Sequence, residues 1–367
     1  MVQLTMPSVL FVGLATYSRV GGMQNFNRRV IANLGTLVQA GHVAGAAAWL
    51  MDDRTEDLPT IPGVALTGFG RDRLAMIRRL IAAIAALGRG TVLLVGHINL
   101  LPLAWLARLL RPQLRTVLFV HGDEVWNDEL RRRRPYEPWM LRGIELIASV
   151  SAYTARMMAQ EYRVAQTKFI VFPNVIDDFA DPPPRSARGH HILCVTRIGP
   201  GDRRKNVDQL IRAVGLLRAR GRPVRLTHVG DGELRGELEA LVQDLSLGDA
   251  VRFRGRVSDE VLGQLYAEAD VFALPSSKEG FGIVYLEAWS RGLPVLCGEK
   301  GAPHEIIDDG VDGRVADEAD VTDLADKLDN LLSRPDAATM GLRGLAKVRA
   351  RYLNDRALDN LRQLLTP

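Results

Sequence analysis

The 367-residue chain has few cysteines and no long apolar run. Its two cysteines, Cys194 and Cys297, each lie inside an apolar run, which argues against a disulfide framework and favours a reducing cytoplasm. The most apolar segment is interrupted by Arg78 and Arg79, so no stretch reaches the roughly 18 apolar residues of a membrane span. The N-terminus lacks a charged region followed by an apolar one, and we expect no signal peptide.

Motifs of several common enzyme classes are missing as well. There is no P-loop, no G-x-S-x-G and no G-x-G-x-x-G, which argues against P-loop nucleotide hydrolases, the corresponding serine hydrolases and dinucleotide-dependent enzymes. There is no His or Cys pair at zinc spacing, and no two aspartates stand two positions apart. The D-x-D that holds a divalent metal on a nucleotide-sugar is therefore absent, and we expect neither a metal nor a cofactor.

Basic residues cluster, although the formal net charge is only +4. One group surrounds an apolar helical segment and the other is an unbroken run: Arg71, Arg73, Arg78 and Arg79, and Arg131, Arg132, Arg133 and Arg134. No aromatic residues are interleaved for base stacking, so nucleic acid is not expected and an anionic membrane surface suits the pattern better. A solvated basic face is an equally weighted alternative.

Short, nearly continuous apolar runs alternate with helix-length amphipathic segments along the chain. Such runs are typical of strands buried on both faces, and their repetition predicts parallel sheets. Three consecutive prolines, Pro182 to Pro184, predict a linker. The predicted fold class is α/β: two Rossmann-like doubly wound domains, residues 1–180 and 186–350, facing across a cleft. A last helix, about residues 352–367, is expected to pack back on the first domain.

In such sheets ligands bind outside the carboxyl ends of the strands, so loops directly after strands are the candidate sites. The stretch EGFGIVYLE, Glu279 to Glu287, follows one predicted strand and begins a helix. The backbone N–H groups of Phe281, Gly282 and Ile283 would face an anion at the helix N-terminus. Two flanking carboxylates would repel phosphate and instead suit the hydroxyls of a sugar or ribose. By spacing alone, an acidic first helical turn is the plainer explanation.

A second loop, TRIGPGDRRKN, joins another predicted strand to its helix. Arg197 offers a bidentate fork and Lys205 a point charge, which together suit a diphosphate leaving group. A solvated basic loop explains the same residues equally well.

Three further strand ends carry candidates for lining the cleft. They are Gly21 and Gly22 after the first strand, His121 after TVLFV, and Asn174 and Asp177 in PNVID. Glycines leave backbone N–H groups accessible, and the other side chains are polar. A lone histidine is more often structural than functional, and that alternative stays open for His121.

Together these motifs resemble the group-1 (family 4) retaining nucleotide-sugar glycosyltransferases of the GT-B type. The resemblance covers nearly the whole chain and rests on order and spacing: GG at 21–22, HG at 121–122, SVSAYTA at 149–155, PNVID at 173–177, TRIGPGDRRKN at 196–206, HVGDGELR at 228–235, RGRVSDEVLGQLYAEADVFALPS at 254–276 and EGFG with its later Glu. PNVID lacks a glycine that the family usually has after Asn, which leaves the contacts of that segment open.

The resemblance implies donor-binding roles for the second half of the chain. Glu287 would bind the ribose hydroxyls and Glu279 the transferred sugar, while the N–H groups of residues 281–283 would hold sugar hydroxyls or phosphate. Arg197 and Lys205 would bind the diphosphate and stabilise its charge as it leaves.

The resemblance also implies roles outside these loops. Backbone near Arg256 and Val257 would meet the base, His121 would approach the donor sugar, and Gly22 would line the phosphate and acceptor side. No carboxylate nucleophile is identifiable. We therefore expect same-face attack, with the leaving diphosphate taking the acceptor proton and catalysis arising from positioning and electrostatics, without a metal.

The predicted function is hexosyl transfer from a UDP- or GDP-sugar to a saccharide or lipid-linked saccharide, in bacterial polysaccharide or glycolipid assembly. Two alternatives stay open: a nucleotide-sugar 2-epimerase of the same architecture, and a non-enzymatic two-domain sugar-binding protein. A cytoplasmic location is expected, peripheral on the inner face of the membrane if the basic helix binds lipid.

Overall fold

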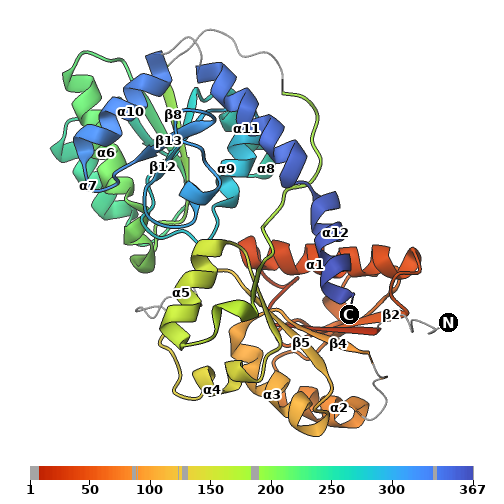
Figure 1. Cartoon of the computed structure of the whole chain (residues 1–367). Helices are drawn as coiled ribbons and strands as arrows, with labels where there is room; N and C mark the ends of the chain where they lie inside the picture. The colour runs from red at the N-terminus through yellow and green to blue at the C-terminus, as the bar shows by residue number, and fades with distance from the viewer. Residues whose placement is uncertain are drawn as a thin grey trace. The chain divides into compact units, whose positions relative to one another are not determined.

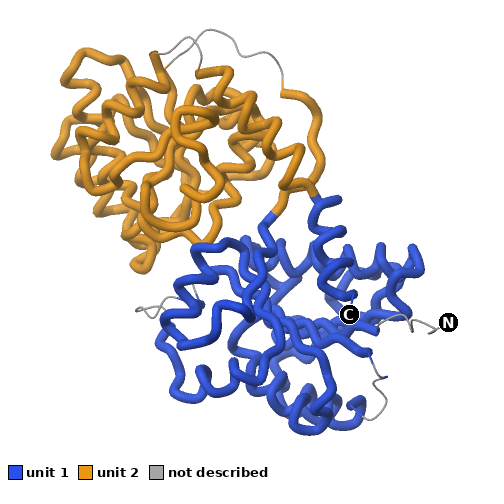
Figure 2. Tube along the Cα trace, in the orientation of Figure 1, with its two compact units in different colours: residues 1–174, 354–367 blue, residues 175–353 orange. Residues whose placement is uncertain are grey.

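The structure, a computed structural model, describes residues 8–84, 88, 90–122, 124–125, 131–182, 190–333 and 337–366. The chain forms two compact units, residues 1–174 with 354–367 and residues 175–353 (Figure 2). Each unit is built on one parallel sheet, so the predicted class of two Rossmann-like α/β domains is confirmed. The first unit ends at Asn174, earlier than the predicted 180. Most of the predicted linker, residues 183–189, lies outside the described residues.

Unit 1 contains a seven-stranded sheet in the order β3-β2-β1-β4-β5-β6-β7 (Figure 1). The strands are β1 (Ser8–Gly13), β2 (Gly45–Leu50), β3 (Val64–Gly68), β4 (Val92–Val95), β5 (Arg115–Val120), β6 (Leu146–Ser149) and β7 (Phe169–Val171). The side chains of β1, β4 and β5 are almost all buried, as their continuous apolar runs predict. The order reverses between β1 and β4, so their carboxyl ends flank the crevice where such sheets bind ligands.

Helices cover both faces of this sheet. They are α1 (Gly22–Gln39), α2 (Arg73–Ile84), α3 (Leu101–Leu110), α4 (Glu137–Arg142), α5 (Ala152–Tyr162) and α12 (Asn354–Leu365). Alternate residues of β1 enter two cores: Phe11 packs with α1 and α12, and Val12 packs with α2, α3 and α5. None of the described helices in either unit has both the length and the apolarity to cross a bilayer.

α12 comes from the far end of the chain yet completes unit 1. Leu361, Leu364 and Leu365 are buried in the same core cluster as α1. Asn33 and Asn354 exchange side-chain amide hydrogen bonds of 3.2 and 3.1 Å. Because each fully buried leucine contributes about 1.5–3 kcal/mol, α12 is a substantial part of this core.

Unit 2 repeats the architecture with a six-stranded sheet in the order β10-β9-β8-β11-β12-β13. The strands are β8 (His191–Val195), β9 (Arg225–Val229), β10 (Val251–Phe253), β11 (Val271–Leu274), β12 (Val295–Gly298) and β13 (Gly313–Ala316). The helices are α6 (Val207–Ala219), α7 (Arg235–Asp244), α8 (Asp259–Glu268), α9 (Ile283–Ser290), α10 (Val321–Ser333) and α11 (Ala337–Arg351).

The α9 and α11 helices pack in unusually close contact. A side chain added at Gly344 of α11 would lie 2.1 Å from the Trp289 ring of α9. Trp289 is fully buried, and its indole N–H donates a 3.0 Å hydrogen bond to Asp312 O. The position of α9 therefore depends on α11 having a glycine, Gly344, where the two helices meet.

Candidate functional site

The EGFG turn leads from β11 to the N-terminus of α9. Gly282 precedes the helix in a left-handed conformation, with φ +88° and ψ +60°, and a side chain added there would lie 2.5 Å from the Tyr285 ring. Tyr285 cannot easily yield, because it is buried and its hydroxyl donates a 2.6 Å hydrogen bond to Leu274 O. The turn thus presents Phe281, Gly282 and Ile283 at the carboxyl edge of the sheet, where the first N–H groups of a helix have no intrahelical acceptor.

Two predicted site residues from separate loops meet beside this turn. Lys205 ends the short 3-10 helix η4 (Pro200–Lys205), and its Nζ lies 2.5 Å from Glu279 Oε2. Their side chains are only 16% and 19% exposed. Asn206 Nδ2 donates a 2.8 Å hydrogen bond to Pro275 O, which ties the two loops together. The contact arises because β8 and β11 are neighbours in the sheet.

Arg197 lies in the loop after β8 with its side chain 71% exposed. Its guanidinium is 3.6 Å from Asp202 Oδ1, and Asp202 also accepts a 3.0 Å hydrogen bond from the Gly199 N–H. Arg197 and Lys205 therefore supply two positive charges from one strand end, one exposed and one partly buried. Within the described ranges, no three His, Cys, Asp or Glu side chains are grouped so as to hold a metal ion.

Glu287, inside α9, is partly buried and contacts a tyrosine that the sequence did not single out. The Tyr266 hydroxyl donates a 3.1 Å hydrogen bond to Glu287 Oε2. Burial raises the pKa of Glu287 above its usual value, and the hydrogen bond from Tyr266 opposes that rise. Burial, together with the nearby carboxylate, raises the pKa of Tyr266 well above its usual value, so its hydroxyl stays protonated. Tyr266 lay within a segment quoted for the resemblance, which was the one signal for it.

Arg256 and Val257 follow β10 at the same edge of the sheet. The Gly230 N–H, after β9, donates a 2.9 Å hydrogen bond to Gly255 O, so the loops after β9 and β10 are joined. Arg256 is exposed and Val257 half-buried. The structure thus places the predicted base-contacting backbone in a loop held by its neighbour.

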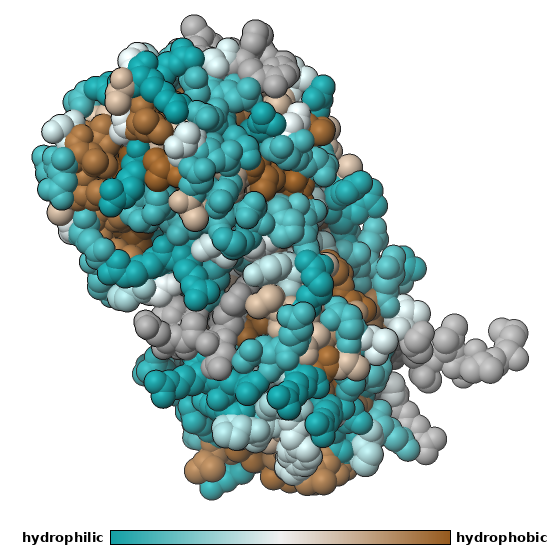
Figure 3. Space-filling view, turned by 60° about the vertical axis from the view of Figure 1, so that its left-hand side comes forward, coloured by the Kyte–Doolittle hydropathy of each residue, from teal (hydrophilic) through white to brown (hydrophobic). Residues whose placement is uncertain are grey.

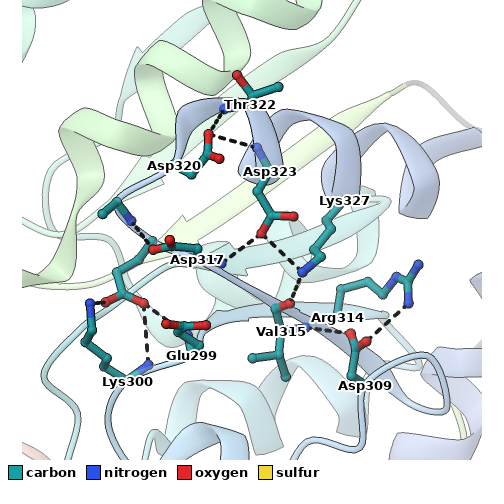
Figure 4. Close-up of polar contacts among 12 residues, drawn as sticks. Glu299, Lys300, Asp309, Arg314, Val315, Asp317, Asp320, Thr322, Asp323 and Lys327 are labelled. Carbon is teal, nitrogen blue, oxygen red and sulfur yellow. Dashed lines mark hydrogen bonds and ion pairs between the residues drawn. The ribbon is translucent and has the colours of Figure 1, made fainter.

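A buried carboxylate after β13 supports the Glu279 loop through the segment that follows β12. Glu318, after β13, accepts N–H hydrogen bonds from Glu299 at 3.0 Å and Lys300 at 3.4 Å, and Lys300 Nζ lies 3.1 Å from its second oxygen (Figure 4). Two residues later, the Ala302 N–H donates a 2.9 Å hydrogen bond to Glu279 O. Glu318 therefore orders the segment against which the Glu279 backbone rests.

His121 directly follows β5 in unit 1. The N–H groups of His121 and Gly122 donate to the two carboxylate oxygens of Glu124 at 2.5 and 3.1 Å. The His121 ring packs edge-on against Phe26 of α1, with centroids 4.6 Å apart. Glu124, the fourth residue after β5, is buried and was missed by sequence reasoning.

The loop before Gly21 is held by another carboxylate that the sequence did not reveal. Asp53, buried after β2, accepts hydrogen bonds of 2.6 to 2.8 Å from three successive N–H groups, Thr16 to Ser18. Gly21 is the N-cap residue of α1. A side chain added at Gly22 would meet no atom within 4 Å, so packing leaves space at this position.

The chain leaves unit 1 at Asn174, so Asn174 and Asp177 belong to different units. Asn174 is half-buried and Asp177 exposed. Between them, the Ile176 N–H donates a 2.9 Å hydrogen bond to Tyr352 O. This segment therefore pairs with the chain that leads into α12.

The basic run is not wholly a surface feature, and the prediction for Arg131 is wrong. Its side chain is 16% exposed, forms an ion pair with the buried Glu137 and donates a 3.0 Å hydrogen bond to the Tyr162 hydroxyl. Arg131 therefore stabilises the packing of α4 and α5. The other predicted membrane-facing arginines are exposed: Arg71, Arg73, Arg78, Arg79, Arg132, Arg133 and Arg134.

Comparison with known proteins links this chain to sugar-transferring enzymes. Residues 20–178 match the family described as Glycosyltransferase Family 4, and residues 187–342 match Glycosyl transferases group 1. The GDP-mannose-dependent alpha-(1-6)-phosphatidylinositol monomannoside mannosyltransferase of Mycolicibacterium smegmatis is 34% identical over 263 residues, covering 66% of this chain and 68% of that protein. The protein of the same name from Mycobacterium tuberculosis is 31% identical over 269 residues, covering 68% and 69%.

Solved structures share the fold over nearly the whole chain. Anabaena Alr3699/HepE in complex with UDP and glucose matches with a TM-score of 0.75 and 18% identity, covering 98% of this chain and 99% of that one. Sucrose-phosphate synthase from Thermosynechococcus elongatus matches with a TM-score of 0.76 and 20% identity, covering 98% of both chains. The predicted GT-B fold class is confirmed.

Proposed function

Because the chain belongs to the group 1 glycosyltransferases, the family that its motifs resemble, we propose that it transfers a mannosyl group from GDP-mannose to a glycolipid. It is a glycosyltransferase, as predicted, and the proposal concerns donor, acceptor and mechanism. Four relatives at 30–34% identity are named GDP-mannose-dependent mannosyltransferases of phosphatidylinositol mannosides, which favours GDP over UDP.

The observation that carries the proposal is the contact between Lys205 and Glu279 at the N-terminus of α9. A cation, a carboxylate and helix N–H groups converge at one strand edge. A diphosphate needs positive charge and N–H donors, and a sugar needs a carboxylate for its hydroxyls. Lys205 Nζ and Glu279 Oε2 are 2.5 Å apart, so the group suited to the diphosphate lies directly beside the group suited to the sugar.

The mechanism that we propose is same-face transfer with retention. The bond between the anomeric carbon and the diphosphate oxygen breaks with its electron pair leaving to the diphosphate, and the acceptor oxygen bonds to the same face of the sugar. The acceptor proton passes to the leaving oxygen. Lys205 and Arg197 offset the charge that develops there, so we expect the reaction to need no metal. Glu279, neutralised by Lys205, would orient sugar hydroxyls rather than attack.

The remaining candidates take binding roles in this proposal. Glu287 would accept hydrogen bonds from the ribose hydroxyls, with Tyr266 holding its carboxylate in place, and backbone at Arg256 and Val257 would meet the base. In unit 1, His121, held by Glu124, would contact substrate.

A nucleotide-sugar panel tests the proposal. GDP-mannose should raise Tm more than UDP-glucose does. At a hundredfold its Kd, a bound ligand stabilises the folded state by about 2.7 kcal/mol. The protein should then hydrolyse the donor slowly in EDTA and transfer mannose with the α configuration retained, as read by NMR.

Lys205→Ala should lower turnover on the order of a hundredfold or more. Arg203→Ala is the matched control, because Arg203 lies in the same short helix but pairs with Glu237 on the surface.

The same panel separates the alternatives. Loss of turnover on chelation would contradict the metal-free mechanism. An isomer at carbon 2 of the donor, formed without acceptor, would indicate an epimerase. Stabilisation by saccharides with no turnover of any nucleotide-sugar would indicate a binding protein.

We also propose that the face formed by α2, α3 and α4 docks on an anionic membrane surface. Large apolar side chains are exposed on these helices: Leu74, Ile81, Leu109, Leu110 and Trp139. Figure 3 shows hydrophobic side chains along the lower edge, the level at which α2 and α3 lie in Figure 1. Apolar groups beside exposed arginines are typical of an interfacial surface. Flotation with anionic vesicles should show salt-sensitive binding that Ile81→Glu weakens; no binding at low salt would reject this surface.

A further inference from the structure

Unit 1 has a cavity of about 480 Å³ whose walls come from the point where the strand order reverses. It is lined by residues that follow β1, β2 and β4, by α2 and α3, and by the segment before α4. The carboxyl ends of strands at such a reversal are where doubly wound sheets bind ligands. The volume lies within the range of small-molecule sites, roughly 300–1,000 Å³.

Part of the cavity lining is basic. Arg73 of α2 and Arg134 before α4 both contribute to the lining, and Arg134 Nη1 donates a 2.7 Å hydrogen bond to the Tyr136 hydroxyl, which holds it beside the cavity. Two guanidinium groups suit the non-bridging oxygens of a phosphodiester. Asp52, after β2, also lines the cavity. Its carboxylate repels phosphate but accepts hydrogen bonds from hydroxyls, so an occupant would direct a polyol toward Asp52.

Another part of the lining, the apolar wall, is formed by Ile77 of α2 and by Leu103 and Leu106 of α3. A sugar phosphate would gain little from this wall, whereas a hydrocarbon chain would gain about fourfold in affinity for each methylene that it buries there. The same two helices carry the exposed apolar side chains of the proposed membrane-docking face. The wall and that face therefore lie on the same pair of helices.

We propose that this cavity binds the head group and first methylenes of a phospholipid-type acceptor. The phosphodiester lies between the two arginines, the head-group hydroxyls lie beside Asp52, and the chain lies against the apolar wall. The inference rests on the proposed function in taking the acceptor to be a glycolipid, and it adds the residues that select one.

Calorimetry with the full chain tests the proposal with two probes, a short-chain phosphatidylinositol below its micelle concentration and glycerophosphoinositol, which has no chains. The short-chain lipid should bind about tenfold or more tightly, since several methylenes are buried. Arg73→Ala and Arg134→Ala should each weaken it about tenfold. Leu106→Trp, which fills the cavity, should weaken it further. Arg78→Ala is the matched control, because Arg78 is exposed on the same helix and does not line the cavity.

Equal binding of the two probes would overturn the lipid assignment. If neither arginine substitution weakened lipid binding, or if Arg78→Ala weakened it equally, binding in this cavity would be ruled out. If the wild-type protein hydrolyses no nucleotide-sugar, the proposed function fails while lipid binding still decides the cavity. If hydrolysis persists and lipid binding ignores these residues, the cavity proposal alone fails.

Discussion

Buried carboxylates with defined partners recur at the carboxyl edges of both sheets. Asp53, Glu124 and Glu318 accept backbone N–H groups and so fix loops, whereas Glu279 and Glu287 contact side chains. In the first three, backbone N–H groups supply hydrogen bonds to carboxylates that are removed from water. Glu287 accepts a side-chain hydrogen bond from Tyr266, and burial raises its pKa.

The ionised carboxylate of Glu287 should therefore lower the stability of the fold while increasing the affinity for the donor. Its pKa is raised on folding, so between the unfolded and folded values the folded state holds the extra proton and stability falls as pH rises. Glu287→Gln removes that loss and should raise Tm at about pH 8 but not at about pH 4. Donor affinity should fall about tenfold to a hundredfold. Thermal melts at both pH values and donor titration measure this, and a lower Tm at pH 8 would contradict it.

Tyr266 should tune the pH dependence of donor binding. Its hydroxyl lowers the pKa of Glu287 by donating to the carboxylate, so Tyr266→Phe should raise that pKa and move the acidic limb of donor affinity to higher pH. Affinity at neutral pH should fall about two- to tenfold. Tyr285→Phe is the control, because it loses a buried hydrogen bond to Leu274 O without touching Glu287. An identical shift in both variants would remove the specific role of Tyr266.

At the scale of elements, the N-terminus of α9 depends on one left-handed residue. Gly282→Ala should cost about 1–2 kcal/mol in backbone strain and also press a methyl against the Tyr285 ring. We expect a lower Tm and a kcat/KM reduced about tenfold or more. Gly221→Ala imposes similar strain at φ +78° with no atom within 4 Å, so it should lower Tm and spare turnover. Normal turnover in Gly282→Ala would show that the turn geometry is not needed.

Elements with strong local signals were predictable from sequence. The helix starting at Ile283 was predictable from the stop signals Gly292 and Pro294 that follow it. The last helix, Asn354–Leu365, was predictable from its place after the end of the second domain's pattern. The contact between Lys205 and Glu279 was not derivable from spacing, since it depends on which strands are neighbours. Arg131 was misplaced for the same reason: whether an arginine is solvated depends on partners such as Glu137, which local sequence does not reveal.

At the scale of the whole molecule, the last helix ties the end of the chain to the stability of unit 1. Ending the chain after Leu353 removes three buried leucines and the Asn33 contact, so hydrogen exchange should accelerate in β1 and α1 and stay unchanged in α9. Leu361→Ala is a milder version and should cost about 2–5 kcal/mol. Leu342→Ala, exposed on α11, is the control. Equal acceleration in both units would contradict this assignment.

The close packing at Gly344 has a consequence for mutational scanning. Any side chain there would displace Trp289 and, with it, the helix that begins at the EGFG turn. Gly344 should therefore tolerate substitution as poorly as Glu279. A saturation map scored on activity alone would rank the two together, and a parallel map of protein abundance would separate them, with Gly344 losing abundance and Glu279 keeping it.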